Sequence, residues 1–456
     1  MDIQDEKVII IGSGTSGISA ANLAVSKKAK VSLYDQKTLD QHEDKAKDNL
    51  YNLEKSGVKL LLGVDIIKHI KDYKLIIKSP GVPMDLDFIQ YAKEKGSSVI
   101  GEFEFAYRYC MADIIAITGT NGKTTTTSMV ASITKAYIPN TYVVGNIGRA
   151  FSEDVGKITR DDKVVAELSS YQLESSIDFH PKISSVLNIE ADHLNRHGTM
   201  ANYIEAKEKI FSNQGEEDFL VLNFDDPRCR LMEGKSKARV IWFSNKEKVI
   251  PGVYEEDGYI VEHINDDKNR ICHIRDLKVL GSHNIENALA AVTITSIMGI
   301  PKDIIEREIT SFKGVAHRIE YVGSKKGVDF FNDSKATNPE AAIKGLLAMD
   351  KKVRLIVGGL DEGNDLSKWI SLFTDLVEKA YVIGETKDQF AKIFKAQDFN
   401  SYEEFNNLEE AVQGAYKDAF EGECILLSPG CASWDMFKSF EERGDIFKNI
   451  FQSLEE

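Results

Sequence analysis

The chain has 456 residues, of which 42% are hydrophobic and 28% are charged, a composition typical of globular proteins. At about 150 residues per domain, this length predicts about three domains. The formal net charge of −15 argues against nucleic-acid binding, so an anionic ligand would need a local basic pocket. The sequence contains no apolar run of the roughly 18 residues that a membrane span requires, and we expect no membrane insertion.

Two further features predict a cytoplasmic protein. The N-terminus MDIQDEK is acidic and lacks both the basic and the apolar segment of a signal peptide. The five cysteines are widely spaced and form no C-x-x-C pair, which favours reduced thiols over a disulfide framework or a zinc site.

A short β-branched run, a loop of small residues and a helical stretch recur in this order along the chain. The runs are Val8–Ile11, Ile114–Ile117, Val164–Leu168, Val353–Val357 and Ile425–Leu427. Alternating strands and helices predict parallel sheets covered on both faces, with ligands beyond the carboxyl ends of the strands. We place the domains at residues 1–101, 102–314 and 315–456.

The first glycine-rich loop, Gly12–Gly17, has the pattern G-x-G-x-x-G between a strand and a helix, and a second strand, Lys30–Tyr34, leads into Asp35. Taken alone, this pattern predicts NAD or FAD binding. Its backbone N–H groups suit any diphosphate at a helix N-terminus, and a UDP-sugar carries the same group. A tight turn that binds nothing is the plain alternative.

The second loop, TGTNGKTT, has only two residues between Gly119 and Gly122, whereas the common phosphate-binding loop has four. The physical features of such a loop are nevertheless present. Lys123 can reach the terminal phosphates of a nucleotide, and the hydroxyl of Thr124 can bind Mg²⁺. The alternative is a structural turn that happens to precede a lysine.

Further motifs follow in a fixed order over nearly the whole chain. They are GNIG at Gly145–Gly148, AELSSYQL at Ala166–Leu173, NIEADHLNRHG at Asn188–Gly198, YIEAKEKIF at Tyr203–Phe211, GSHNIEN at Gly281–Asn287, AHRIE at Ala316–Glu320, NDSKATNP at Asn332–Pro339 and SPGCASWDMF at Ser428–Phe437. With the short TGTNGKTT loop, this series resembles the Mur ligase superfamily, ATP-dependent amide-forming enzymes of cell-wall and folylpolyglutamate synthesis. The last two motifs are similar to those of its D-glutamate-adding branch, since relatives that add diaminopimelate or lysine carry a D-N-P-R-type motif instead of NDSKATN.

The resemblance implies an α/β fold with three domains: an N-terminal Rossmann-like domain for a UDP-substrate, a central P-loop-type ATPase sheet and a C-terminal Rossmann-like domain. It implies that a carboxylate of UDP-N-acetylmuramoyl-L-alanine attacks the γ-phosphate of ATP, and that the amine of D-glutamate then displaces phosphate from the acyl phosphate. The implied cofactors are ATP and Mg²⁺, or Mn²⁺, and the partners are these small molecules. We expect a monomer.

For nucleotide and metal, the resemblance implies sites in the second and third domains. The ATP-binding residues are Gly119, Thr120, Asn121, Gly122, Lys123, Thr124, Thr125, Asn284, Asn287, Arg318 and Asp333. The metal site comprises Thr124, Glu167, His193 and Lys207, with Lys207 carrying a carbamate, and the catalytic residues are Lys123, His193, Lys207 and Lys335. The plain alternatives are a solvent-facing acid for Glu167, a hydrogen-bonded core residue for His193 and a solvated helix face for Lys207.

The two substrates have their own sets of residues. For the UDP-substrate these are Ser13, Gly14, Thr15, Ser16, Asp35, Lys37, Ser79, Gly81 and Asn146. For D-glutamate they are Lys335, Thr337, Ser433 and Phe440. Glu362 departs from the family pattern, because many relatives have a basic residue near this place for the side-chain carboxylate of D-glutamate. Other groups must therefore hold that carboxylate, or the loop alignment slips by a residue.

Three other functions are compatible with parts of the sequence. A ligase of the same superfamily could add another amino acid, an oxidoreductase could use the loop Gly12–Gly17 for a nicotinamide or flavin, and a non-catalytic module could bind ATP. The oxidoreductase leaves Lys123, Glu167 and His193 without a role. In the preferred interpretation, closure of the third domain brings Arg318 to the phosphates bound by the second.

Overall fold

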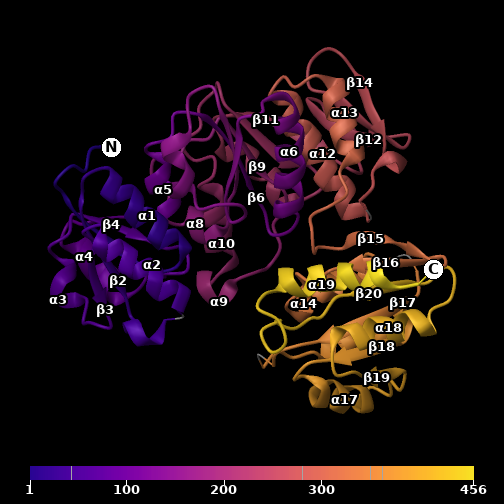
Figure 1. Cartoon of the computed structure of the whole chain (residues 1–456). Helices are drawn as coiled ribbons and strands as arrows, with labels where there is room; N and C mark the ends of the chain where they lie inside the picture. The colour runs from indigo at the N-terminus through magenta and orange to yellow at the C-terminus, as the bar shows by residue number, and fades with distance from the viewer. Residues whose placement is uncertain (43, 280, 350, 362, 456) are drawn as a thin grey trace. The chain divides into compact units, whose positions relative to one another are not determined.

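The computed structural model describes residues 1–42, 44–279, 281–349, 351–361 and 363–455. Two compact units divide the chain, one formed by Met1–Asp276 with His283–Thr310 and the other by Leu277–Ser282 with Ser311–Glu456. The described residues form three sheets flanked by helices, two in the first unit and one in the second (Figure 1). The predicted α/β fold is confirmed, while the domain boundaries near residues 101 and 314 stay a prediction.

The first sheet is parallel and has the strand order β3-β2-β1-β4-β5. Its strands are β1 (Lys7–Ile11), β2 (Lys30–Asp35), β3 (Lys59–Leu62), β4 (Leu75–Lys78) and β5 (Ser98–Gly101). The helices that follow them are α1 (Thr15–Ser26), α2 (Asp44–Lys55), α3 (Ile67–Ile70), α4 (Asp87–Glu94) and α5 (Glu102–Tyr107). The chain order reverses between β1 and β4, and ligands of such sheets bind in the crevice at this point.

The second sheet has nine strands in the order β14-β13-β12-β11-β10-β9-β6-β8-β7. They are β6 (Asp113–Thr118), β7 (Thr141–Gly145), β8 (Lys163–Glu167), β9 (Ile183–Val186), β10 (Phe219–Asn223), β11 (Arg239–Ser244), β12 (Gly252–Glu256), β13 (Tyr259–His263) and β14 (Asn269–His273). The associated helices are α6 (Lys123–Tyr137), α7 (Phe151–Asp154), α8 (Ser170–Leu173), α9 (Leu194–His197), α10 (Met200–Glu208), α11 (Pro227–Arg230), α12 (Ser282–Ile297) and α13 (Lys302–Ser311). The seven strands β6 to β12 are parallel to one another, and β13 and β14 extend the sheet as antiparallel strands.

The third sheet has the order β15-β16-β20-β17-β18-β19, with β15 antiparallel to its neighbour. Its strands are β15 (Glu320–Lys325), β16 (Val328–Asn332), β17 (Val353–Gly358), β18 (Val377–Ile383), β19 (Tyr402–Glu404) and β20 (Cys424–Leu427). Its helices are α14 (Pro339–Leu347), α15 (Ser367–Ile370), α16 (Phe373–Leu376), α17 (Lys387–Ala396), α18 (Leu408–Asp418) and α19 (Phe440–Ser453).

The cores follow from the alternation of side chains along each strand. In the third sheet, Leu355 and Val357 of β17 belong to one apolar cluster, whereas Ile356 between them belongs to the cluster on the opposite face. In the first unit, a single apolar cluster includes residues of both sheets, and Phe103 of α5 packs on Phe151 of α7 with ring centroids 5.0 Å apart. The first two sheets therefore share a core.

Across the described ranges, the structure has no helix with the length and apolar character needed to cross a bilayer.

Candidate active site

The short glycine loop directly follows β6 and leads into α6. Gly122 caps this helix with a left-handed backbone (φ +81°), and a Cβ added to it would lie 2.2 Å from Oδ1 of Asn287. A larger residue would therefore both strain the turn and clash. The conformation leaves the first N–H groups of α6, from Lys123 onward, at the end of a 15-residue helix, where an anion is stabilised.

The segment 188–190, which follows β9, holds the loop in place. The backbone N–H of Thr120 donates to the carbonyl of Asn188 (2.9 Å), and that of Asn121 donates to Asn188 Oδ1 (2.7 Å). The Asn121 side chain donates to Glu190 Oε2 (2.6 Å). Lys123 Nζ donates to the carbonyls of Gly119 and Thr120, both at 2.9 Å. The Lys123 amine, which is predicted to bind phosphates, thus contacts the backbone of the glycine loop.

The two asparagines predicted to bind ATP, Asn284 and Asn287, lie in the first turns of α12, and Asn287 contacts α6. Asn287 Oδ1 accepts a hydrogen bond from the hydroxyl of Thr126 (3.2 Å), and Asn287 Nδ2 donates to Asn284 Oδ1 (3.0 Å). The first unit therefore brings Asn284 and Asn287 to the helix that begins with Lys123 and Thr124, although about 160 residues separate them in sequence.

Glu167 is the last residue of β8, opposite Ile117 of β6, and is fully buried. Its Oε1 accepts a hydrogen bond from Asn146 Nδ2 (2.8 Å), whereas its Oε2 is buried without a hydrogen-bond partner in the described part of the chain. The alternative of a solvent-facing acid is wrong. A buried carboxylate oxygen with free lone pairs fits a hard cation such as Mg²⁺, and the hydroxyl of Thr124 is a suitable companion ligand.

The protein alone does not complete such a site. Within the described residues, no group of three or more His, Cys, Asp or Glu side chains is arranged to hold a metal ion. Mg²⁺ prefers six oxygen ligands and usually takes several from phosphates and water. The donor set therefore fits a metal that is bound together with a nucleotide.

Lys207 lies in α10 and is 1% exposed, so the alternative of a solvated helix face is wrong. Its Nζ donates to the carbonyl of Gly119 (2.8 Å) and to the hydroxyl of Thr118 (3.4 Å), both neutral groups. Burial, and then the nearby charge of Lys123, lower the pKa of Lys207 well below its ordinary value. The lowered pKa favours the unprotonated form of the amine, which is its nucleophilic form.

His193 stands at the start of α9 in a left-handed conformation (φ +52°), with its side chain half exposed. Its ring lies 5.0 Å from that of Tyr171, and its Nε2 lies 3.5 Å from Asp192 Oδ2. The alternative of a buried core histidine does not apply. An exposed imidazole on a short loop is available to a metal or a substrate.

The first loop lies at the reversal point of the first sheet. Ser13 donates to Asp35 Oδ2 through its N–H (2.9 Å) and its hydroxyl (2.5 Å), and the N–H of Lys37 donates to Asp35 Oδ1 (3.0 Å). Burial raises the pKa of Asp35, but these hydrogen bonds outweigh burial and hold the pKa below its ordinary value. Asp35 is thus an ionised anchor for the loop.

Ser79 and Gly81 follow β4 and lie beside this loop. A Cβ on Gly12, which has φ +98°, would lie 2.8 Å from the hydroxyl of Ser79. That hydroxyl is buried and, within the described residues, has no hydrogen-bond partner. Gly14 caps α1, so Thr15 and Ser16 present their N–H groups at a helix N-terminus. An unpaired hydroxyl beside such N–H groups fits a diphosphate.

In the second unit, Asp333 follows β16 and is 3% exposed. Its Oδ2 accepts a hydrogen bond from the Ser428 hydroxyl (2.8 Å), and its Oδ1 accepts one from the N–H of Ile319 (3.2 Å). Burial raises the pKa of Asp333 to about 7, although Ser428 and Arg318 act in the opposite direction. The structure thus brings Asp333 next to the AHRIE and SPGCAS motifs.

The residues predicted for D-glutamate lie in the same part of this unit. Lys335 Nζ is 5.9 Å from the ring centroid of Phe440, the first residue of α19, Ser433 is buried, and Thr337 is half buried. Glu362 lies outside the described residues. The role of each of these residues stays a prediction.

The chain matches models of three consecutive domains. They are the Mur ligase MurD-like N-terminal domain at residues 6–101, the Mur ligase middle domain at residues 117–295, and the Mur ligase glutamate ligase domain at residues 317–431. A protein of Thermoanaerobacter sp. (strain X514), named UDP-N-acetylmuramoylalanine–D-glutamate ligase, is 43% identical with 100% of both chains covered. A protein of the same name from Alkaliphilus oremlandii (strain OhILAs) is 42% identical, again with 100% of both chains covered. The chain belongs to the Mur ligase family. The predicted family is thereby confirmed.

Solved structures of other Mur ligases have the same fold at low sequence identity. MurF from Acinetobacter baumannii has a TM-score of 0.61 and 15% identity, covering 98% of this chain and 93% of that chain. The UDP-N-acetylmuramate-alanine ligase MurC from Thermotoga maritima has a TM-score of 0.58 and 19% identity, covering 98% and 99%. These matches support the three-sheet architecture of this Mur ligase family member.

One residue that organises the second unit was not among the predicted site residues. Arg443 of α19 is fully buried, and its guanidinium donates to the hydroxyl (3.0 Å) and carbonyl (2.9 Å) of Ser334 and to the carbonyl of Cys431 (3.2 Å). It therefore ties the NDSKATNP motif to the SPGCAS motif. Its spacing from Phe447 and Phe451, on the buried face of α19, is the sequence signal that could have identified it.

Proposed function

We propose that this Mur ligase family member joins D-glutamate to UDP-N-acetylmuramoyl-L-alanine at the cost of ATP, in the synthesis of a peptidoglycan precursor. One observation carries the proposal: the full-length identity of 43% to a relative named for this activity. The MurD-like N-terminal domain, matched at residues 6–101, supports the UDP-linked substrate. We expect the enzyme to act as a monomer in the cytoplasm.

The first chemical step brings a substrate carboxylate to the terminal phosphate of ATP, so negative charges must be balanced before the bond can form. We assign Lys123 and the loop residues Gly119, Thr120, Asn121, Gly122, Thr124 and Thr125 to the phosphates. We assign Glu167, Thr124 and His193 to Mg²⁺, which would neutralise charge on the phosphates when bound. Support comes from the unpaired Oε2 of Glu167 and the exposed ring of His193.

We assign a carbamate to Lys207. In its unprotonated form, Nζ attacks the carbon of CO₂: the N–C bond forms as one C=O π bond opens onto oxygen, and loss of one N–H proton leaves an anionic carbamate in place of the amine. The low pKa caused by burial supports this assignment, because only an unprotonated amine can react. The carbamate would place two carboxylate-like oxygens next to Gly119, at the position of the Lys207 amine.

The second step uses residues of the second unit. We assign Lys335, Thr337, Ser433 and Phe440 to D-glutamate, and Arg318 and Asp333 to ATP, with Arg443 holding the two motifs that carry most of them.

The decisive experiment is phosphate release by the full chain with ATP, Mg²⁺ and UDP-N-acetylmuramoyl-L-alanine. We expect release with D-glutamate and none above background with L-glutamate, diaminopimelate or L-lysine. Equal or greater release with another amino acid would overturn the assigned acceptor. Nicotinamide or flavin binding without phosphate release would favour the oxidoreductase alternative.

A further inference from the structure

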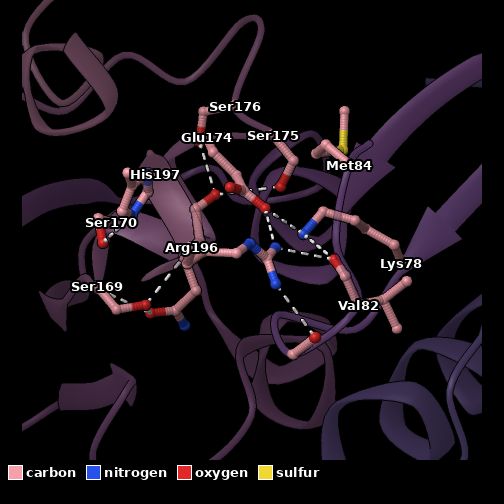
Figure 2. A network of polar contacts seen from close by, with 12 residues as sticks. Lys78, Val82, Met84, Ser169, Ser170, Glu174, Ser175, Ser176, Arg196 and His197 are labelled. Carbon is pink, nitrogen blue, oxygen red and sulfur yellow. Dashed lines mark hydrogen bonds and ion pairs between the residues drawn. The ribbon is translucent and has the colours of Figure 1, made fainter. Parts of the chain in front are cut away.

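A charged cluster connects the first two sheets of the first unit (Figure 2). Lys78 ends β4, Glu174 follows α8, and Arg196 lies in α9. Glu174 Oε1 accepts hydrogen bonds from Lys78 Nζ (3.0 Å) and from Arg196 Nη2 (2.6 Å). Lys78 and Arg196 also donate to the same carbonyl, that of Val82, at 3.0 and 3.2 Å. Three segments far apart in sequence thus meet at one carboxylate.

The cluster is largely shielded from water. The side chain of Lys78 is 0% exposed, that of Glu174 16% and that of Arg196 17%. Lys209 adds a third cation, because its Nζ donates to the carbonyl of Glu174 (2.6 Å). Buried ion pairs contribute little to net stability, because desolvation offsets the Coulomb attraction. The arrangement therefore calls for an explanation other than stability.

The geometry at Arg196 depends on the flat guanidinium. Besides its bonds to Glu174 and Val82, Nη1 lies 3.4 Å from the carbonyl of Gly81, and the guanidinium carbon lies 5.0 Å from the ring centroid of Tyr171. A planar fork can serve several acceptors and stack on a ring at the same time, whereas the single amine of lysine cannot. The loop that contains Gly81 is therefore fixed in direction as well as in distance.

Arg196 lies between two loops that carry predicted site residues: the loop with His193 and the loop with Ser79 and Gly81. It lies three residues after His193, on the short helix that His193 caps. It also holds Gly81 and Val82, which follow Ser79 after one intervening residue, and the unpaired hydroxyl of Ser79 lies beside the loop Gly12–Gly17. One side chain thus connects the loop assigned to the UDP moiety with the loop assigned to the metal.

We propose that Arg196, supported by Glu174 and Lys78, is a positioning residue that fixes the UDP-binding loop relative to the phosphate-transfer site. In a UDP-linked substrate, the reacting carboxylate lies at the opposite end of the molecule from the UDP group. Its position therefore depends on the position of the UDP-binding loop relative to the phosphate-transfer site. A small misplacement of reacting groups costs up to about a hundredfold in rate. This inference rests on the proposed function for its substrate, and on the observed contacts for the coupling.

The test compares Arg196→Met with Arg196→Lys and with a matched control, Arg239→Met. Arg239 also donates to a backbone carbonyl (Glu216, 2.9 Å), pairs with a glutamate (Glu217, 3.4 Å) and stacks on a ring (Phe219, 5.9 Å), but at the amino-terminal edge of the second sheet. For each variant, the measurements are kcat, the KM values for UDP-N-acetylmuramoyl-L-alanine and ATP, and the melting temperature.

For Arg196→Met we expect the KM for the UDP-substrate to rise by about tenfold or more, because the loop that carries Gly81 and Val82 loses the charged hydrogen bonds that hold it. We expect the KM for ATP to stay within about twofold of wild type, and Arg196→Lys to recover only part of the loss. Arg239→Met should leave both KM values unchanged. Equal rises in the two KM values, or an Arg196→Met enzyme with a wild-type KM for the UDP-substrate, would overturn the proposal.

Amide hydrogen exchange separates this inference from the proposed function. The N–H of Val82 donates to the carbonyl of Ser79 (3.0 Å), and its exchange reports on the loop without any substrate. We expect faster exchange at Val82 in Arg196→Met and in Glu174→Gln than in wild type and Arg239→Met. Unchanged exchange would refute the coupling. A wild-type chain that releases no phosphate with its substrates would instead refute the proposed function.

Discussion

Lys78 and Lys207 are both almost completely buried, yet their surroundings differ. Lys78 forms an ion pair with Glu174 at 3.0 Å, whereas Lys207 donates to a carbonyl and a hydroxyl near the phosphate loop. Burial lowers the pKa of both amines. The charge of Glu174 counteracts burial at Lys78, while the charge of Lys123 adds to it at Lys207. The same residue type is therefore paired with a carboxylate in one region, and in the other it lies beside neutral hydrogen-bond partners and a second cation.

The difference teaches how to interpret buried polar groups in this protein. A buried charged group that is paired with a group of opposite charge holds segments together. Lys78 does so between β4 and the loop after α8. A buried group surrounded by neutral or like-charged neighbours is held at a cost in stability of a few kcal/mol. Lys207 belongs to the second kind, and the Oε2 atom of Glu167 has no hydrogen-bond partner among the described residues; both groups lie among the predicted site residues.

The largest expected effect is the loss of activity when Lys207, the buried lysine near the phosphate loop, is replaced. We expect Lys207→Ala to lower D-glutamate-dependent phosphate release by about 100- to 1000-fold, the range for removing one preorganised electrostatic contact. Short carboxylic acids added to this variant should restore part of the activity, because they can replace the carbamate. Steady-state rates with and without formate or acetate measure this.

A control for the carbamate uses the wild-type chain. Exhaustive removal of dissolved CO₂ should lower its activity, and bicarbonate should restore it. Activity that is insensitive to CO₂, together with a Lys207→Ala variant that no carboxylic acid rescues, would contradict the carbamate and leave Lys207 as an unmodified amine.

At Lys78 the comparison predicts an effect on stability. Glu174→Gln leaves Lys78 and Arg196 without their shared carboxylate, so we expect it to lower the free energy of unfolding by about 3 kcal/mol. Lys78→Met should cost about 1 kcal/mol or less, since an apolar side chain replaces a buried cation and Glu174 keeps Arg196. Chemical denaturation of both variants measures the difference, and equal losses would contradict the assignment of Glu174 as the centre of the cluster.

Much of the fold followed from local patterns. The predicted β-branched runs, such as Val8–Ile11 and Val353–Val357, lie in strands, except that Val164–Leu168 extends one residue beyond β8. Alternation and loop composition are local properties, so the sequence alone could indicate these strands. Motif order placed the chain in its family. What the sequence could not reveal was burial within a helix: Lys207 and Lys209 lie two residues apart, yet the first is 1% exposed and the second only half buried.

Partners distant in sequence were equally out of reach. The contact of Arg443 with Ser334 spans 109 residues, and that of Lys78 with Glu174 spans 96. Such pairs depend on how β4, α8, α19 and their neighbours pack, which no local propensity encodes. The predicted site residues came from the resemblance, whereas the residues that position them required the structure.

Asp333 offers the same kind of test for a buried carboxyl group, because its shifted pKa makes the free energy of unfolding depend on pH. Its pKa of about 7 in the folded chain lies above the ordinary value of 3.8, so folding favours the protonated form. The associated stability is therefore present at low pH and is lost as pH rises from about 4 to about 7, at up to about 1.4 kcal/mol per pH unit. Asp333→Asn should flatten this decline, as urea unfolding between these pH values will measure; an unchanged slope would assign the decline to other groups.

The smallest expected effect concerns Ser79, whose buried hydroxyl has no partner among the described residues. Ser79→Ala removes this unpaired group, so the free energy of unfolding should stay constant or rise by about 0.5 kcal/mol. Affinity for UDP-N-acetylmuramoyl-L-alanine should nevertheless fall about fivefold, the equivalent of one neutral hydrogen bond.

Ser185 of β9 is the matched control, because within the described chain its buried hydroxyl also has no partner, and it lies in a different sheet from Ser79. Ser185→Ala should match Ser79→Ala in stability and leave the affinity unchanged, as calorimetric titration of both variants will measure. If Ser79→Ala binds the UDP-substrate as tightly as Ser185→Ala does, an unpaired buried hydroxyl is no guide to a ligand in this chain. The contrast between Lys78 and Lys207 would then hold for charged groups alone, whose burial costs several times more than that of a hydroxyl.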